Sequence, residues 1–110
     1  MFKVTITSVR PTLQYDFHKY DADMYDYIQE TFIDPGTLIA YKTTISEDQT
    51  TEVCEMMFDS KKSWLAYKKD PVIAYHEPKK VRYNMIHMIA VSTNMMDIVV
   101  TKDLYNLYLR

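Results

Sequence analysis

Residues 37–69 constrain the fold of this chain more than any other part of the sequence. Two stretches of β-forming side chains, TLIAYKTTI and TTEVCEMMF, flank a short polar turn. Asp59 and its neighbouring serine then precede KKSWLAYKK, and both are preferred residues at the start of a helix. The sequence therefore predicts strand, turn, strand and helix in this order, which is half of a split β-α-β domain.

The residues before this segment predict one further strand and one helix. FKVTIT alternates apolar with polar side chains from the second residue onward, as a half-buried strand does. Asp21 or Asp23 can cap a helix that runs to about Phe32, with its apolar residues gathered on one face. The tripeptide Asp34-Pro35-Gly36 is typical of a tight turn.

The last third of the chain leaves two interpretations open. Pro78 suits the first turn of a helix that includes residues 79–92, but Met85–Val91 also alternates like a strand. The length of the segment favours the helix. Asp97–Thr101 then predicts a short strand. Leu104–Arg110 can be a strand exchanged between subunits, a short helix or a frayed end.

These elements predict a single α+β domain over residues 1–110. Their order is that of a ferredoxin-like fold, in which two split β-α-β units form an antiparallel sheet with helices on one face. The other face of such a small sheet needs cover, and a second copy can provide it by packing sheet on sheet. We therefore expect a homodimer.

Three pieces of the sequence carry a resemblance to a known group of proteins: FKVTITSVRP, the hairpin at 38–58 and DSKKSWLAYKKDP. Over about residues 1–70 the chain resembles the dimeric α+β barrel group, which includes monooxygenases of the antibiotic-biosynthesis type. The resemblance lies in the pattern of elements, so it bears on the fold more than on the function.

Composition excludes several kinds of site. The only glycine is Gly36, so the glycine-rich phosphate loops of nucleotide-binding proteins are absent. His18, His76, His87 and the single cysteine, Cys54, lack the spacing of a metal site, and we predict neither a metal nor a cofactor. One cysteine allows no internal disulfide, which favours a cytoplasmic location. We expect no signal peptide and no membrane span.

The resemblance implies where a ligand would bind. Cofactor-independent monooxygenases of this group use an apolar cavity with a few polar groups. On this basis the pocket candidates are Tyr41, Trp64, Tyr83 and His87. The related haem-degrading type implies an iron ligand, for which His76 or His87 would be the candidate. Aromatic residues at such positions also serve as ordinary core, so an enzyme is not the favoured hypothesis.

Charge is distributed unevenly along the chain. Residues 11–35 hold six acids against the single Lys19, whereas residues 59–82 hold six lysines and one arginine against three acids. Opposed charges can steer a symmetric dimer or a charged partner. The candidate partner-surface residues are Lys61, Lys62, Lys79, Lys80, Arg82, Asp23, Asp26 and Glu30.

Three functions remain open from the sequence. We favour a non-catalytic binding or regulatory accessory protein that acts through protein–protein contacts, because no catalytic constellation is present and 10 tyrosines and 8 methionines suit an adaptable surface. The alternative is a cofactor-independent monooxygenase-like enzyme. A second alternative is a module for single-stranded nucleic acid, using rings that include Trp64, Tyr67, Tyr75 and Tyr83. The net charge of −2 disfavours nucleic acid.

Overall fold

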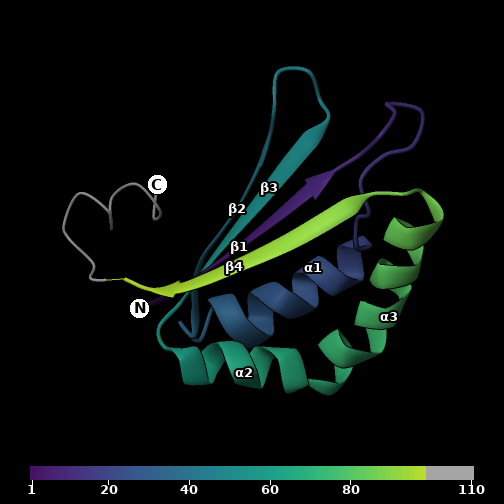
Figure 1. Cartoon of the computed structure of the whole chain (residues 1–110). Coiled ribbons are helices and arrows are strands. Elements are labelled where there is room, and N and C mark those ends of the chain that lie inside the picture. The colour runs from purple at the N-terminus through teal and green to yellow at the C-terminus, as the bar shows by residue number, and fades with distance from the viewer. Residues whose placement is uncertain (99–110) are drawn as a thin grey trace.

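The chain folds into a four-stranded antiparallel sheet with all of its described helices on one side (Figure 1). The computed structural model describes residues 1–98. In chain order the elements are β1 (Phe2–Val9), α1 (Ala22–Ile28), the π-helical turn η1 (Gln29–Ile33), β2 (Leu38–Ile45), β3 (Thr51–Phe58), α2 (Lys61–Lys69), α3 (Pro71–Ile86) and β4 (Ala90–Asp97). The strand order β2-β3-β1-β4 confirms the predicted ferredoxin-like α+β fold.

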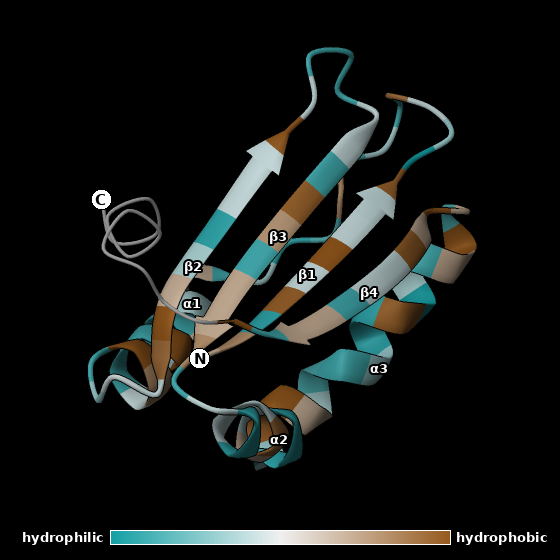
Figure 2. Ribbon diagram, turned by 60° about the vertical axis from the view of Figure 1, so that its left-hand side comes forward, coloured by the Kyte–Doolittle hydropathy of each residue, from teal (hydrophilic) through white to brown (hydrophobic). Residues whose placement is uncertain are grey.

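β1 lies inside the sheet and pairs with β3 on one side and β4 on the other, both antiparallel. Its register places Val4 opposite Met56 of β3 and Met95 of β4. Phe2 and Val4 are buried beneath the helices, and polar residues alternate with them along the strand, as Figure 2 shows by colour. This alternation is the period-2 pattern of the sequence, so the side chains themselves set the register.

The core lies where β3 and β2 meet the helices. Val4, Leu38 and Phe58 are fully enclosed, and burial of each large side chain contributes about 1.5–3 kcal/mol to folding. The Phe58 ring lies 5.4 Å, centroid to centroid, from the rings of both Trp64 and Tyr67. These ring contacts fix α2 against β3.

The first two predicted helix starts and the predicted turn are confirmed. Asp21 caps α1, because its Oδ1 accepts a hydrogen bond of 2.9 Å from the Met24 amide. Ser60 caps α2 by accepting from the Ser63 amide at 3.2 Å. Gly36 has a φ of +90°, the left-handed region that glycine adopts at little cost.

The predicted helix over 79–92 is wrong at both ends. α3 begins at Pro71 because the Asp70 carboxylate accepts hydrogen bonds from the amides of Val72 and Ile73, at 3.0 and 3.2 Å. It ends at Ile86, before Met88 takes a φ of +56°.

β4 occupies Ala90–Asp97, so the strand predicted from Asp97 begins earlier than expected. Ile98 lies just after the end of β4, and residues 99–101 of the predicted strand, like Leu104–Arg110, lie outside the described residues. The alternative prediction, a strand over Met85–Val91, is right only for Ala90 and Val91, which begin β4.

The face of the sheet away from the helices carries mixed side chains. Thr7 of β1 stands opposite Val53 of β3 and Ser92 of β4, near the middle of this face. Lys3 and Glu55 form an ion pair of 3.2 Å across β1 and β3. We call this surface the open face. None of the helices in the described part of the chain is long and apolar enough to cross a membrane.

The contacts of Asp70 predict how much its substitution should lower the free energy of unfolding. Besides capping α3, its carboxylate accepts a hydrogen bond from the Tyr27 hydroxyl at 2.8 Å, which ties α1 to the junction of α2 and α3. Asp70→Ala should lower the free energy of unfolding by about 1–3 kcal/mol, because it removes the cap and this bond together. Tyr27→Phe should cost about 0.5–1.5 kcal/mol. Urea unfolding measures both.

Glu47→Ala is the matched control, because Glu47 is exposed in the turn between β2 and β3. Substitution there should leave the unfolding midpoint unchanged. An Asp70→Ala protein as stable as this control would contradict the assigned role of Asp70.

Candidate functional site

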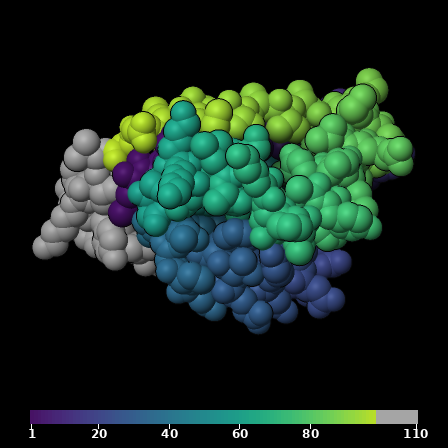
Figure 3. Space-filling view, turned by 90° about the horizontal axis from the view of Figure 1, so that it is seen from below, coloured from purple at the N-terminus to yellow at the C-terminus, as the bar shows by residue number. Residues whose placement is uncertain are grey.

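Two adjoining cavities lie between the helix-facing side of the sheet and the helices. The loop cavity, beside Phe17 and His18, has a volume of about 240 Å³. The helix cavity, beside Trp64 and Tyr67, has a volume of about 250 Å³. Figure 3 shows a hollow where α2 and α3 meet β4, at the helix cavity. Five residues line both cavities: Ile6, Tyr20, Tyr41, Cys54 and Lys80.

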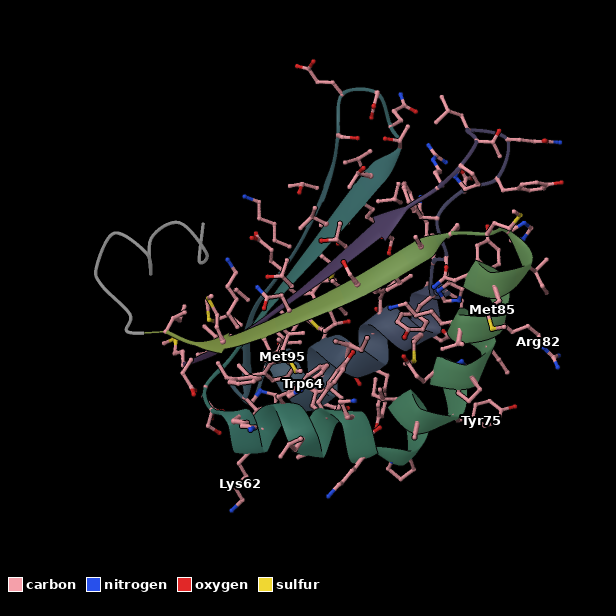
Figure 4. All side chains as sticks on the ribbon, in the orientation of Figure 1. Lys62, Trp64, Tyr75, Arg82, Met85 and Met95 are labelled. Atoms are coloured by element: carbon pink, nitrogen blue, oxygen red, sulfur yellow. The ribbon has the colours of Figure 1, made fainter. Side chains whose placement is uncertain are left out.

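The walls of the helix cavity are mainly aromatic and apolar. Trp64 and Tyr67 come from α2, Met56 from β3 and Ile73 from the first turn of α3, and each of these residues is buried. In Figure 4, Trp64 of α2 and Met95 of β4 lie close together where these two elements face each other. Each cavity alone is slightly smaller than a typical small-molecule site, and the two together reach that size.

Three tyrosines and one thiol line the cavities: Tyr20, Tyr41 and Cys54 line both, and Tyr67 lines the helix cavity. Burial raises the pKa of Tyr20 to about 12, with a smaller contribution from the charge of Glu77. Burial also raises the pKa values of Tyr41, Tyr67 and Cys54. All four groups are therefore protonated at neutral pH and can donate hydrogen bonds.

The hydroxyls of Tyr20 and Tyr67 are open to this space. No hydrogen bond to either hydroxyl is present within residues 1–98, although Tyr67 is only 6% exposed. In the described part of the chain, every side-chain nitrogen or oxygen that is fully buried has a hydrogen-bond partner, so an oxygen without a partner is not fully buried. These two hydroxyls therefore reach the cavities, where a water molecule or a ligand can satisfy them.

Lys80 is the cation that lines both cavities. It is half-buried on α3. Its charge, after the larger effect of burial, lowers the pKa of the His18 imidazole. Burial raises the pKa of Glu52, and Lys80 opposes that shift.

The structure brings together two of the four predicted pocket residues. Tyr41 lines both cavities and Trp64 lines the helix cavity. Tyr83 and His87 line neither: their rings lie 4.4 Å apart, and the Tyr83 hydroxyl donates to the backbone carbonyl of Asp16. They attach the loop before α1 to the last turns of α3.

Sequence reasoning missed Lys80 as a cavity residue, although a signal for it exists. Ile73, Glu77, Lys80 and Asn84 recur at helical spacing and all border the cavities, and Ile73 and Asn84 are buried. The pattern becomes visible only if the helix starts at Pro71. Tyr20 has no comparable signal, because its position depends on the path of a loop.

Neither His76 nor His87, the histidines that the resemblance implied as an iron ligand, lines these cavities, and the histidine of the loop cavity is His18. The His76 ring instead lies 6.2 Å from that of Tyr20 and 5.2 Å from that of Tyr75. Among residues 1–98 there is also no cluster of three or more histidine, cysteine or acidic side chains that could hold a metal ion.

The predicted partner-surface residues divide into two groups. Lys80 faces the cavities. The other seven are exposed on the helices and η1: Lys61, Lys62, Lys79, Arg82, Asp23, Asp26 and Glu30. In Figure 4, Lys62 and Arg82 point away from the sheet. Trp64 and Tyr67 are buried, so these two rings of the basic segment are not available to stack on nucleic-acid bases.

Solved structures with the same fold support the resemblance seen in the sequence. A candidate antibiotic biosynthesis monooxygenase from Deinococcus radiodurans has a TM-score of 0.57 at 6% identity, over 92% of this chain and 95% of that one. Rv0793 from Mycobacterium tuberculosis has a TM-score of 0.58 at 10% identity, over 93% and 99%. A dimeric ferredoxin-like protein from an uncultured marine organism has a TM-score of 0.55 at 10% identity, over 92% and 97%.

At these identities the likeness shows the fold alone. The suspected group, antibiotic-biosynthesis-type and dimeric ferredoxin-like proteins, is confirmed at that level. No protein-family model matches the sequence, and no curated protein sequence does.

The raised pKa of Tyr20 predicts how stability depends on pH. A tyrosine with a pKa near 10 when unfolded and about 12 when folded stabilises the fold fully below pH 10, and this contribution is lost as pH rises toward 12. The melting temperature of the protein should therefore fall between pH 9.5 and about 11.5. It should fall less steeply in Tyr20→Phe. Differential scanning fluorimetry across this range measures the slope.

Tyr75→Phe provides the exposed control, since that side chain is 65% exposed. If Tyr20→Phe kept the same slope as the parent protein, burial of the Tyr20 hydroxyl would not be the cause of the alkaline destabilisation.

Proposed function

We propose that this protein binds a small planar aromatic molecule in the joined loop and helix cavities. The observation that carries the proposal is the junction itself. The hydroxyl of Tyr20, which lines both cavities, and that of Tyr67, which lines the helix cavity, face open space and lack a protein partner among the described residues. A filled core would have closed this space or satisfied these groups.

The chemistry of the walls indicates the kind of ligand. The rings of Trp64, Tyr67 and Tyr41 offer faces and edges on which a planar molecule can pack. The tyrosine hydroxyls are protonated and can donate to an oxygen atom on that molecule. Mostly apolar walls with a few directed polar groups are the usual composition of a small-molecule site.

This proposal needs no catalytic group, so it keeps the non-catalytic role that the sequence favours but replaces a protein partner with a small molecule. A cytoplasmic location belongs to the same proposal, because the lone Cys54 thiol suits a reducing compartment.

Cofactor-independent oxygenation is the second candidate. The fold is that of a candidate antibiotic biosynthesis monooxygenase, and the cavity provides O–H donors that would stabilise negative charge developing on a substrate oxygen. In that reaction the electron-rich substrate would itself reduce O₂. Oxygen consumption that requires both the protein and a bound phenol, and that falls in Tyr20→Phe, would distinguish this candidate from simple binding.

We also propose that two copies of the chain pair through their open faces. No described helix covers this side of the sheet (Figure 1), and one of the structures with the same fold is named as dimeric. Two such sheets can stack face to face about 10 Å apart. The Thr7 side chains, near the middle of each open face, would then lie inside the interface.

The proposed ligand site predicts two signals in one experiment. The only tryptophan and the only cysteine of the chain, Trp64 and Cys54, both line the cavities. Saturation with the neutral probe 2-naphthol should change the fluorescence of Trp64 and slow alkylation of Cys54 by iodoacetamide at least threefold. Thr93→Tyr should weaken both effects, because Thr93 lines the helix cavity from β4 and a larger side chain fills part of it.

Ala74→Tyr is the matched control. Ala74 is exposed on α3 and lines neither cavity, so binding of the probe should be unchanged. If 2-naphthol and a panel of similar aromatic compounds left Trp64 and Cys54 unaffected, the proposed function would be contradicted.

The proposed dimer predicts the mass of the protein in solution. Sedimentation equilibrium should give twice the chain mass of 13.1 kDa for the parent protein. Thr7→Glu should give the monomer, because two negative charges would be brought together in the interface. Lys62→Glu, which changes a side chain that points away from the sheet, should remain dimeric. A monomeric parent protein at 100 μM would rule out this pairing.

A further inference from the structure

We infer that the ligand of the joined cavities is a planar aromatic carboxylate, and that the Lys80 ammonium binds its carboxylate group. This inference rests on the proposed function and adds the chemical class of the ligand. No sequence motif includes Lys80. Its place in the structure assigns it this role: it is half-buried on α3 and lines both cavities.

Lys80 has no ion-pair partner in the described part of the chain. The ion pairs there are Lys3–Glu55 and Arg10–Asp16, and no hydrogen bond or ring contact engages the Lys80 ammonium. The neighbouring Lys79, in contrast, is exposed and lies over the Tyr75 ring at 4.2 Å. The charge of Glu52 acts on Lys80 without a direct ion pair, so an incoming anion could make the direct charged contact that the ammonium lacks among the described residues.

The charges around the junction favour an anion. Lys19 borders the loop cavity and Lys68 the helix cavity, and both are exposed. The opposing acids are Glu52, which lines the loop cavity only, and Glu77, which is exposed at the edge of the helix cavity. Three lysines therefore stand against two acids, and Lys80 is the only one of these five that lines both cavities.

A carboxylate also suits the hydrogen-bond donors at the junction. Its two oxygens accept about four hydrogen bonds, and an ammonium with several O–H groups supplies that number. Tyr20 and Tyr41 line both cavities together with Lys80; the Tyr41 hydroxyl already interacts with the Cys54 thiol, whereas the Tyr20 hydroxyl has no partner among residues 1–98. With the carboxylate held here, the aromatic ring of the ligand would extend into the helix cavity, against Trp64 and Met56.

Two probes of the same shape test the charge directly. 2-Naphthoate and 2-naphthamide differ chiefly in the negative charge, so the ratio of their dissociation constants measures what the charge contributes. Titration followed by Trp64 fluorescence should show 2-naphthoate binding about tenfold or more tightly to the parent protein, as expected for a charge-assisted hydrogen bond. Lys80→Met should abolish this preference and leave binding of the amide within about twofold.

Lys79→Met is the matched control, because it removes the neighbouring, exposed lysine of the same helix. It should keep the preference for 2-naphthoate. Lys80→Arg, which preserves the charge, should keep most of it and guards against a folding defect in Lys80→Met.

The possible failures are distinguishable. If 2-naphthol and 2-naphthamide bind but 2-naphthoate binds no better, or if Lys80→Met retains the preference, the carboxylate assignment is wrong and the proposed aromatic site stands. If none of the three compounds binds the parent protein, the proposed function itself is wrong.

Discussion

The packing of Phe58 against Trp64 and Tyr67 determines where the rest of this small structure can lie. These three rings join the end of β3 to α2, with centroids 5.4 Å apart for each contact to Phe58. They hold α2 over the end of the sheet where Phe2 and Leu38 are also buried. The helices therefore close the core at that end.

Near β4, in contrast, the helices do not close the core. α3 leaves α2 at Asp70 and runs along the edge of the sheet, and every residue of β4 remains exposed. The space between this edge and the helices is only partly filled, and the helix cavity occupies it; the loop cavity adjoins it beneath β1, β2 and β3. The site thus arises because the described helices cover the four-stranded sheet incompletely. The uncovered part is bordered by tyrosines whose protonated hydroxyls are able to bind a ligand.

The sequence predicts the local features of this fold well because they depend on neighbouring residues. The hairpin, the cap at Ser60 and the turn at Gly36 follow from propensity and turn chemistry. The start of α3 is different. Asp70 followed by proline is a reasonable signal for the end of a helix, but here the same aspartate ends α2 and caps the next helix, with proline in its favoured first turn.

That one boundary also explains why much of the site was not predicted. If the helix is predicted to begin near Pro78, Ile73 falls outside it, and the helical face that Ile73 shares with Lys80 cannot be recognised. Lys80 is then grouped with Lys79 and Arg82 as a surface charge. Tyr20 reaches the cavity through the path of the loop before α1, which long-range contacts with α3 determine. Tyr41 and Trp64 were predictable because strand alternation and the position in α2 place both toward the core.

Nuclear Overhauser effects between a bound aromatic ligand and the protein test the account most directly. Protons of a naphthalene ring should show intermolecular contacts to the Trp64 indole, the Met56 methyl group and the Cys54 β-protons, which belong to three side chains that line the helix cavity. Contacts confined to exposed side chains such as Tyr75 and Leu65, with none to these three, would show that the cavity is closed in solution and would contradict the proposed site.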